Sequence, residues 1–227
     1  MGRCGDSNRI GSGGVSYAFG GEQGRMKGRM GLVLLAVCFM VVSTPPSNAQ
    51  KGSKDIAFEE ALIDARKISD QLAEKVRGLL LQEIGKGGFS SAVRVCSELA
   101  QEITLQFNAQ TGHDVRRISL KYRNPKNVPD AYEQRKLEEF NILNQKKELS
   151  NEYSEVTEEQ GKKYLRYLRP LIVSPLCITC HGPKEKIPQE VKAILAERYP
   201  DDRATGFLVG DVRGAITVKI PLSEGKR

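Results

Sequence analysis

Cys177, Cys180 and His181 form the one Cys-x-x-Cys-His motif in this chain of 227 residues. This spacing is the attachment signature of c-type haem, in which two thiols bond the vinyl groups of a porphyrin. Two intervening residues let both sulfur atoms reach neighbouring vinyl groups, and the adjacent histidine brings an imidazole nitrogen to the iron. The motif therefore predicts one haem c per chain, with His181 as an axial ligand of the iron.

Other chemistries are compatible with two closely spaced thiols. A redox disulfide usually opens a helix in a thioredoxin-like βαβ unit, and the sequence around the motif lacks that pattern. A zinc site would combine Cys177 and Cys180 with Cys96 and a histidine, but the chain has no second Cys-x-x-Cys pair. The two cysteines could also be a chance structural pair. Haem attachment is the interpretation that we favour.

The sequence does not supply the usual second ligand of a soluble cytochrome c. Candidates for this position are Cys96, His113, a lysine amine, water or no ligand at all. His113 follows Thr-Gly and is expected in an exposed turn, whereas Cys96 fits a buried apolar role as well as a ligand role. The methionines of the chain all lie within residues 1–49, which we expect to be removed: Met1, Met26, Met30 and Met40.

Residues 1–49 have the pattern of a leader. Basic residues at 25, 27 and 29 precede an apolar run over residues 31–42, and small residues follow before Ala49. The run is shorter than the roughly 20 apolar residues that a transmembrane helix needs. We predict cleavage after Ala49, which leaves residues 50–227 as a single mature domain.

Export agrees with the motif, because bacteria attach haem c outside the cytoplasm, where thiols otherwise tend to oxidise. We therefore expect a periplasmic protein. An uncleaved leader would instead anchor the domain in the membrane, facing the periplasm. Residues 1–24 are glycine-rich and polar, so translation starting at Met26 or Met30 is an alternative.

The charge of the chain does not indicate a nucleic-acid partner. The full chain has 35 basic and 28 acidic residues and a net charge of +7. Removal of residues 1–49 leaves 30 basic and 26 acidic residues, a net charge of +4, with both signs interspersed. Three cysteines remain, and haem attachment uses two of them. Cys96 is the one that needs another role.

Two long helices are expected at the start of the mature domain. Apolar residues recur at helical spacing within residues 55–86, and the glycines at 85, 87 and 88 end this helix. A second helix over residues 90–109 carries Cys96 on its apolar stripe. This thiol is therefore expected to face the interior.

The rest of the chain predicts an antiparallel sheet with shorter helices. Strands are expected over residues 115–122, 153–157 and 163–172, helices from Pro129 and over 188–198, and a terminal hairpin over 206–210 and 215–221. This order, helices first and antiparallel strands later, predicts the α+β class. A small cytochrome c is instead all-helical, with its motif near the mature N-terminus.

Several motifs occur in order along the mature chain: Ala92-x-x-x-Cys96, the segment 116–130, Cys177-x-x-Cys180-His181-Gly182, the segment 199–207 and Gly210-Asp211-x-Arg213-Gly214-Ala215. On these motifs, the chain resembles a family of exported haem-c-binding domains of unknown function with a PAS-like fold. The resemblance covers about residues 84–222. Tyr132 departs from the family pattern, where tryptophan is expected.

This resemblance implies an iron held by His181 and Cys96, and a PAS-like antiparallel sheet behind long N-terminal helices. It also makes Arg116, Arg117 and Arg123 candidates for contacts with the haem propionates. The alternative is that these arginines are solvated and their loop is structural. The family has no settled reaction, so the resemblance specifies the cofactor more closely than the role.

The function that we expect is that of a periplasmic redox or small-ligand sensor that responds to CO or NO. Release of Cys96 from the iron could move its helix, and a separate protein partner would receive the signal. The alternative is a low-potential electron-transfer cytochrome, which should keep both ligands in both redox states. We do not expect an enzyme, because a peroxidase needs distal acid–base groups and only His113 could act as one.

Overall fold

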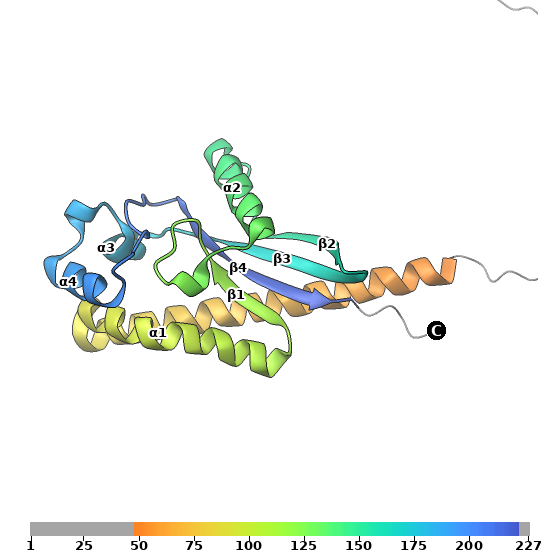
Figure 1. Cartoon of the computed structure of the whole chain (residues 1–227), viewed down its shortest axis with the longest axis horizontal. Helices are drawn as coiled ribbons and strands as arrows, with labels where there is room; N and C mark the ends of the chain where they lie inside the picture. Colours follow the sequence, from red (N-terminus) through yellow and green to blue (C-terminus); the bar gives the residue numbers. More distant parts are fainter. Residues whose placement is uncertain (1–47, 223–227) are drawn as a thin grey trace, which may run out of the picture. The chain divides into compact units, whose positions relative to one another are not determined.

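The computed structural model describes residues 48–222, and the side chains of residues 56–222 except that of Cys96. The leader was predicted over residues 1–49, and residues 1–47 of it lie outside the described residues. Within the described range, no helix is long and apolar enough to cross a bilayer. In chain order, the elements are α1 (Asn48–Thr111), β1 (Asp114–Ile118), η1 (Pro125–Asn127), α2 (Ala131–Lys146), β2 (Tyr153–Glu159), β3 (Lys162–Ile172), η2 (Pro175–Cys177), α3 (Ile178–His181), η3 (Lys184–Lys186), α4 (Gln189–Arg198) and β4 (Val212–Pro221) (Figure 1).

Helix α1 is a helical hairpin with two arms. Its backbone leaves helical geometry at Gly87 and at Gly88. Gly88 has a φ of 69°, which residues other than glycine rarely adopt. Beyond these glycines the chain turns back along the first arm (Figure 1). Leu79 of the first arm and Ile103 of the second arm line one shallow groove. The predicted pair of helices divided by glycines is therefore confirmed.

The four strands form one antiparallel sheet in the order β1-β4-β3-β2. Strand β4 is central, and its Thr217 lies opposite Arg116 of β1 and Leu168 of β3. Strands β2 and β3 are joined by a tight turn at Gln160 and Gly161, both of which have positive φ. The predicted α+β class, the antiparallel sheet and the long N-terminal helices are confirmed.

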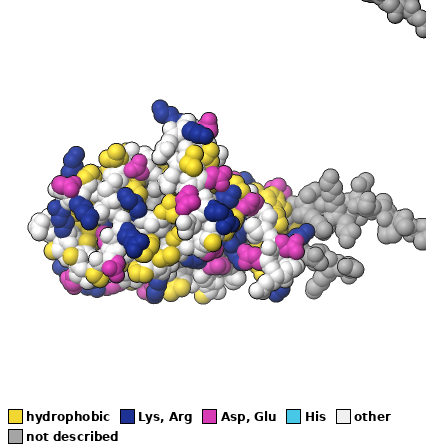
Figure 2. All heavy atoms as spheres, turned by 45° about the horizontal axis from the view of Figure 1, so that its top comes forward, with side chains coloured by type: hydrophobic (Ala, Val, Ile, Leu, Met, Phe, Trp, Pro, Cys, Tyr) yellow, Lys and Arg dark blue, Asp and Glu magenta, His cyan; other side chains and the backbone are white. Residues whose placement is uncertain are grey.

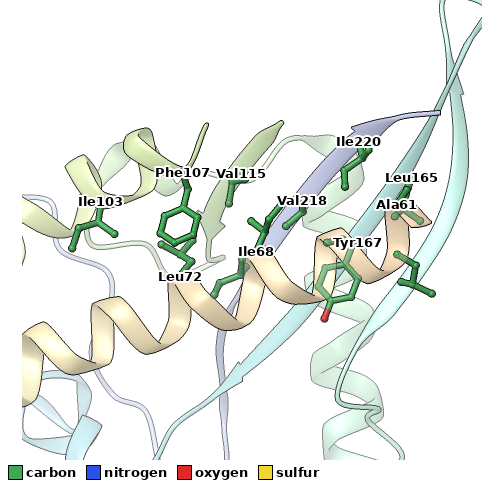
Figure 3. Packing of buried hydrophobic residues seen from close by; sticks show 13 residues of the cluster. Ala61, Ile68, Leu72, Ile103, Phe107, Val115, Leu165, Tyr167, Val218 and Ile220 are labelled. Carbon is green, nitrogen blue, oxygen red and sulfur yellow. The ribbon is translucent and has the colours of Figure 1, made fainter. Parts of the chain in front are cut away.

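The two arms of α1 cover one face of the sheet, and α2 covers the other (Figure 1). This division follows from the alternation of side chains along each strand. On the α1 face, Val218 and Ile220 of β4 pack with Leu72 and Phe107 from the two arms (Figure 3). On the α2 face, the core comprises Ile118, Leu137, Phe140, Leu168, Val212 and Ala215.

Helix α2 begins where the sequence predicts it, and its first turn shows why. Asp130 caps the helix by accepting a hydrogen bond from the backbone N–H of Glu133 at 2.7 Å, and the Glu133 carboxylate accepts from the Asp130 N–H in return. Arg166 of β3 contacts Asp130 at 3.2 Å and stacks over Tyr132. The capping box and the ion pair together fix α2 on its face of the sheet.

The short elements α3 and α4 lie at the end of the sheet near the bend of α1 (Figure 1). Val93 of the second arm packs in one cluster with Cys180 of α3 and with Val191 and Leu195 of α4. Arg198 at the end of α4 pairs with a glutamate of α1 at 3.1 Å. This packing holds the Cys-x-x-Cys-His motif against the second arm.

Two predicted elements need correction. Strand β1 ends at Ile118 rather than near residue 122, because Ser119 donates its backbone N–H to Asn127 and the chain leaves the sheet there. The prediction of a terminal hairpin is wrong, since residues 206–210 form no strand. Gly206 and Gly210 have positive φ, and the Gly206 N–H bonds the Gly182 carbonyl oxygen at 2.8 Å. This segment therefore folds over the motif instead of pairing with β4.

The surface of the described residues carries both signs of charge. Figure 2 shows lysine and arginine side chains interspersed with aspartate and glutamate over the face that it presents. Several of these charges pair across elements, such as Arg66 with Glu152 and Arg169 with Asp70. The pattern matches the mixed surface expected from the sequence, and exposed pairs of this kind contribute little stability.

Candidate haem-attachment site

The two motif cysteines lie on consecutive short turns. Residues of η2 lead directly into α3, so Cys177 and Cys180 are three residues apart on a helical path and lie on the same side of it. Cys177 is half-buried, whereas Cys180 has 8% of its surface exposed. The turn therefore presents two thiols side by side, which is the arrangement that attachment to neighbouring vinyl groups requires.

Ser174 holds the first thiol in place. Its backbone N–H donates to the Cys177 Sγ at 3.4 Å, and its hydroxyl lies 3.2 Å from the same sulfur. Pro175 follows at the start of η2, where its fixed φ suits a helical turn. The Cys177 side chain thus has a defined orientation in the protein itself.

The His181 imidazole is held through one nitrogen. Its Nδ1 lies 2.7 Å from the carbonyl oxygen of Ala204, and because a carbonyl can only accept, Nδ1 carries the proton. The lone pair of the neutral ring is therefore on Nε2. Second-sphere hydrogen bonds of this type fix the tautomer and orientation of metal-binding histidines. His181 is thus arranged to offer Nε2 to a metal.

The surroundings of His181 favour its neutral form. Burial lowers the pKa of the imidazole well below 6.5, and the nearby Arg213 and Arg123 guanidinium groups lower it further. The hydrogen bond to Ala204 opposes this shift but does not outweigh it. The ring of Phe207 meets the imidazole edge-on, with centroids 6.4 Å apart. A neutral imidazole is the form that binds iron.

The neutral state of His181 gives a titration prediction. In a Cys177→Ser/Cys180→Ser variant, which has no attachment thiols, NMR should report a His181 pKa below 6.5. Because the unfolded chain binds this proton more readily than the folded chain, stability should fall as the pH decreases below 6.5 and should level off above it. A His181 pKa at or above 6.5 would contradict this account of the site.

Arg123 connects the motif to two other segments. Its Nη2 donates to the Cys180 carbonyl at 2.6 Å and to the Ala204 carbonyl at 3.4 Å, and its Nε donates to Asp202 at 3.1 Å. The Asp202 carboxylate in turn accepts from the Ala204 N–H at 2.8 Å. The carbonyl that orients His181 is therefore held by Arg123 and Asp202, whose side chains are 12% and 11% exposed.

The backbone of the motif is also tied to the loop before β4. The Phe207 N–H donates to the His181 carbonyl at 3.0 Å, next to the bond between Gly206 and Gly182. A side chain at Gly182 would meet the Ile178 carbonyl oxygen at 2.6 Å. Glycine is therefore required directly after His181, because the end of α3 lies too close for a Cβ atom.

The predicted propionate ligands do not lie together. Of the three, Arg123 contacts the motif, as described above. Arg116 points to the α2 face and bonds Glu133 at 2.9 Å, while Arg117 lies on the opposite face and bonds Thr104 at 3.2 Å. Neighbouring strand residues point to opposite faces, so Arg116 and Arg117 lie on different faces of the sheet. Their role toward propionates stays a prediction.

Cys96 lies in the second arm of α1, but its side chain is outside the described part of the structure. Its helical neighbours Ala92, Val93 and Ala100 are buried, and Val93 packs with Cys180. The end of α1 at Thr111 lies about 22 Å along the helix axis from Cys96 at 1.5 Å per residue, and His113 lies beyond it. The backbone therefore brings the Cys96 position, and not His113, toward the motif.

Sequence reasoning missed the residues that surround His181. Ala204 and Asp202 act through a carbonyl oxygen and a buried ion pair, and Phe207 and Arg213 lie beside the ring. A carbonyl acceptor leaves no trace in a sequence, since every residue has one. The available signal was the position of all four residues in two of the segments that carry the family resemblance, 199–207 and 210–215.

The donor set fits a haem attached at this motif. Two adjacent thiols, an imidazole with a free Nε2 lone pair and a glycine that lets the chain turn directly afterwards are the groups that such attachment uses. Among the described residues, no cluster of three His, Cys, Asp or Glu side chains could hold a metal ion on its own. The site thus contains the groups that haem attachment and one axial ligand would need.

Comparison with known proteins identifies the family. The profile of the Tll0287-like family matches residues 48–221. Among solved structures, the crystal structure of the cyanobacterial heme-protein Tll0287 is similar, with 30% sequence identity and a TM-score of 0.56. The match covers 74% of this chain and 98% of that one. None of the curated proteins compared with the chain matches it. With most of its length matched, the chain belongs to the Tll0287-like family.

Proposed function

We propose that this chain is a c-type haem protein that carries one haem bound to Cys177 and Cys180, with His181 as axial ligand. The observation that carries the proposal is the Nδ1 hydrogen bond of His181 to Ala204, which leaves Nε2 available beside two adjacent thiols. The similarity to a cyanobacterial heme-protein at 30% identity supports it. When bound, the haem supplies a redox-active iron that can take up diatomic gases.

Cys96 is proposed as the second axial ligand. Its helix arm packs against α3 and α4 through Val93, which lies three residues from Cys96 and in one cluster with Cys180. A cysteine bound to iron is a thiolate, because the metal suppresses the pKa of the thiol. A thiolate donates charge, stabilises the ferric state and gives a low reduction potential.

The role that we propose is that of a redox or small-ligand sensor for CO or NO. Cys96 is part of α1, which spans 64 residues and covers one face of the sheet. Loss of the bond between Cys96 and the metal would free this arm to shift, and a separate protein partner would read the shift. We place this protein in the periplasm, and membrane anchoring through an uncleaved leader is the alternative.

Replacement of Cys96 tests the ligand. In the Cys96→Ala variant, expressed with haem-c maturation, the low-spin thiolate signals of the ferric protein should disappear from the absorption and EPR spectra. The reason is that alanine leaves the sixth position without a protein sulfur ligand. Ser97→Ala, on the same arm, is the matched control and should retain the wild-type spectra. Identical spectra for Cys96→Ala and wild type would rule out Cys96 as a ligand.

The alternative function is low-potential electron transfer, and the ligation of the reduced protein separates the two roles. A sensor should bind CO when reduced and should lose Cys96 as ligand on doing so. A carrier should retain both axial ligands and give fast, reversible voltammetry, since unchanged ligation keeps reorganisation small. Reduced protein that neither binds CO nor changes its ligands would favour the carrier.

A further inference from the structure

A second cavity borders Phe207, whose ring also contacts His181. This cavity of about 340 Å³ opens between α2, the chain that leaves β1 and the loop before β4. Leu137 and Val212 line it on the α2 face of the sheet, and Cys177, Cys180 and His181 are not among its lining residues. The volume is at the lower end of the range for small-molecule sites. The cavity therefore lies next to the candidate attachment site. It shares Phe207 and Arg213 with the surroundings of His181, but none of the three motif residues lines it.

The polar lining of this cavity is cationic. Lys121 and Arg213 contribute two positive charges, and Asn141 and Asn144 contribute amides. Asp211 contributes the one carboxylate of the lining, and its Oδ2 already accepts the Leu208 N–H at 2.8 Å. The net charge of the lining is thus +1, and one carboxylate oxygen is used within the protein.

Arg213 carries an unused donor in a buried position. One terminal nitrogen donates to the Ser119 hydroxyl at 2.7 Å and to the Lys121 carbonyl at 3.1 Å. Its Nε, however, is buried and has no hydrogen-bond partner among the described residues. Burial lowers the pKa of this guanidinium to about 10, so burial of the charged form costs free energy. Buried donors without a partner are rare in proteins and call for an acceptor.

The two cations share one aromatic ring. Lys121 Nζ lies 4.7 Å from the Phe207 ring centroid, and the Arg213 guanidinium carbon lies 5.3 Å from it. Lys121 also donates to the Thr205 carbonyl at 3.1 Å, which leaves two of its three N–H groups for another acceptor. Both cations thus line the cavity, and Lys121 has donors to spare.

We propose that this cavity is a binding site for a small organic carboxylate, with Lys121 and Arg213 as the anion-binding pair. A carboxylate offers two acceptor oxygens, which suit an ammonium and a guanidinium group as charged partners. The apolar side chains of Leu120, Leu137 and Val212 would receive a short hydrocarbon body. This site depends on the chain alone and does not rest on the proposed function.

Calorimetric titration of the purified protein tests the site. Benzoate and succinate are the probes, and benzamide and succinamide, of similar size without charge, are the controls. At least one carboxylate should give saturable binding that its amide does not give. Binding of neither carboxylate, or equal binding of acid and amide, would overturn the proposal. Inorganic phosphate binding more tightly than both acids would overturn the carboxylate assignment.

Two variants locate the binding. Lys121→Met should weaken carboxylate binding by about tenfold or more, because it removes a charged donor. Asn141→Asp, which is nearly isosteric, should abolish binding by placing a negative charge in the cavity. Lys146→Met removes the same charge from α2 outside the cavity and should leave binding unchanged. Wild-type affinity in both cavity variants would show that the probe binds elsewhere and would refute the site.

Discussion

Arg123→Met is expected to destabilise the protein by about 3–5 kcal/mol and to disturb the iron environment. The substitution leaves Asp202, 11% exposed, as a buried carboxylate without its cation, and it leaves the Cys180 carbonyl without its donor. Ala204 also loses one of its anchors, and its carbonyl orients His181. Urea unfolding measures the stability, and the Soret and EPR spectra report the iron.

Arg203→Met is the matched control for this prediction. Arg203 is one residue from Asp202 but is exposed and stacks over Tyr122, with 5.0 Å between the guanidinium and the ring. Its loss should cost at most about 1 kcal/mol and should leave the spectra unchanged. Arg123→Lys should be intermediate, since an ammonium cannot span three acceptors as a guanidinium does. Wild-type stability in Arg123→Met would show that Arg123 does not hold the segments around His181 in place.

Gly214→Ala is the second substitution with a large expected effect. A Cβ atom at Gly214 would overlap the Ile118 carbonyl oxygen and would lie 3.2 Å from the Ser119 Cβ. Both neighbours belong to the point where β1 ends beside β4, so backbone would have to move. We expect a loss of about 3 kcal/mol or more, measured by urea unfolding.

Gly78→Ala separates this steric effect from the general effect of glycine. Gly78 lies within the first arm of α1, and nothing within 4 Å would meet an added Cβ. Alanine favours a helix interior over glycine, so this variant should be about 0.5–1 kcal/mol more stable than wild type. Equal stabilities of Gly214→Ala and wild type would mean that β1 and β4 are further apart than described.

Local patterns predicted much of the fold. The apolar stripes and glycines of residues 55–109 indicated the two arms of α1, and strands were expected at the positions of β2 and β3. The hairpin at the C-terminus failed for a physical reason. Residues 206–210 carry turn glycines beside apolar residues, which fits the end of a strand. In the structure, however, the N–H groups of Gly206 and Phe207 donate hydrogen bonds to carbonyl oxygens at the end of α3. Such long-range pairing leaves no periodic signal.

The residues that could bind the haem were predictable from the sequence, but the groups that hold His181 in place were not. The motif named Cys177, Cys180 and His181, because attachment requires particular residue types at fixed spacing. The acceptor of the His181 proton is a backbone carbonyl, so no side chain pointed to Ala204. The strand alternation did contain the information that Arg116 and Arg117 lie on opposite faces.

The central claim is that Cys177 and Cys180 bind one haem covalently. The most direct measurement is the intact mass of the exported, mature chain, denatured after expression with haem-c maturation. The account predicts the mass of the polypeptide plus one haem for wild type, and of the polypeptide alone for Cys177→Ser/Cys180→Ser. A colourless wild-type protein with the mass of the bare polypeptide would contradict it.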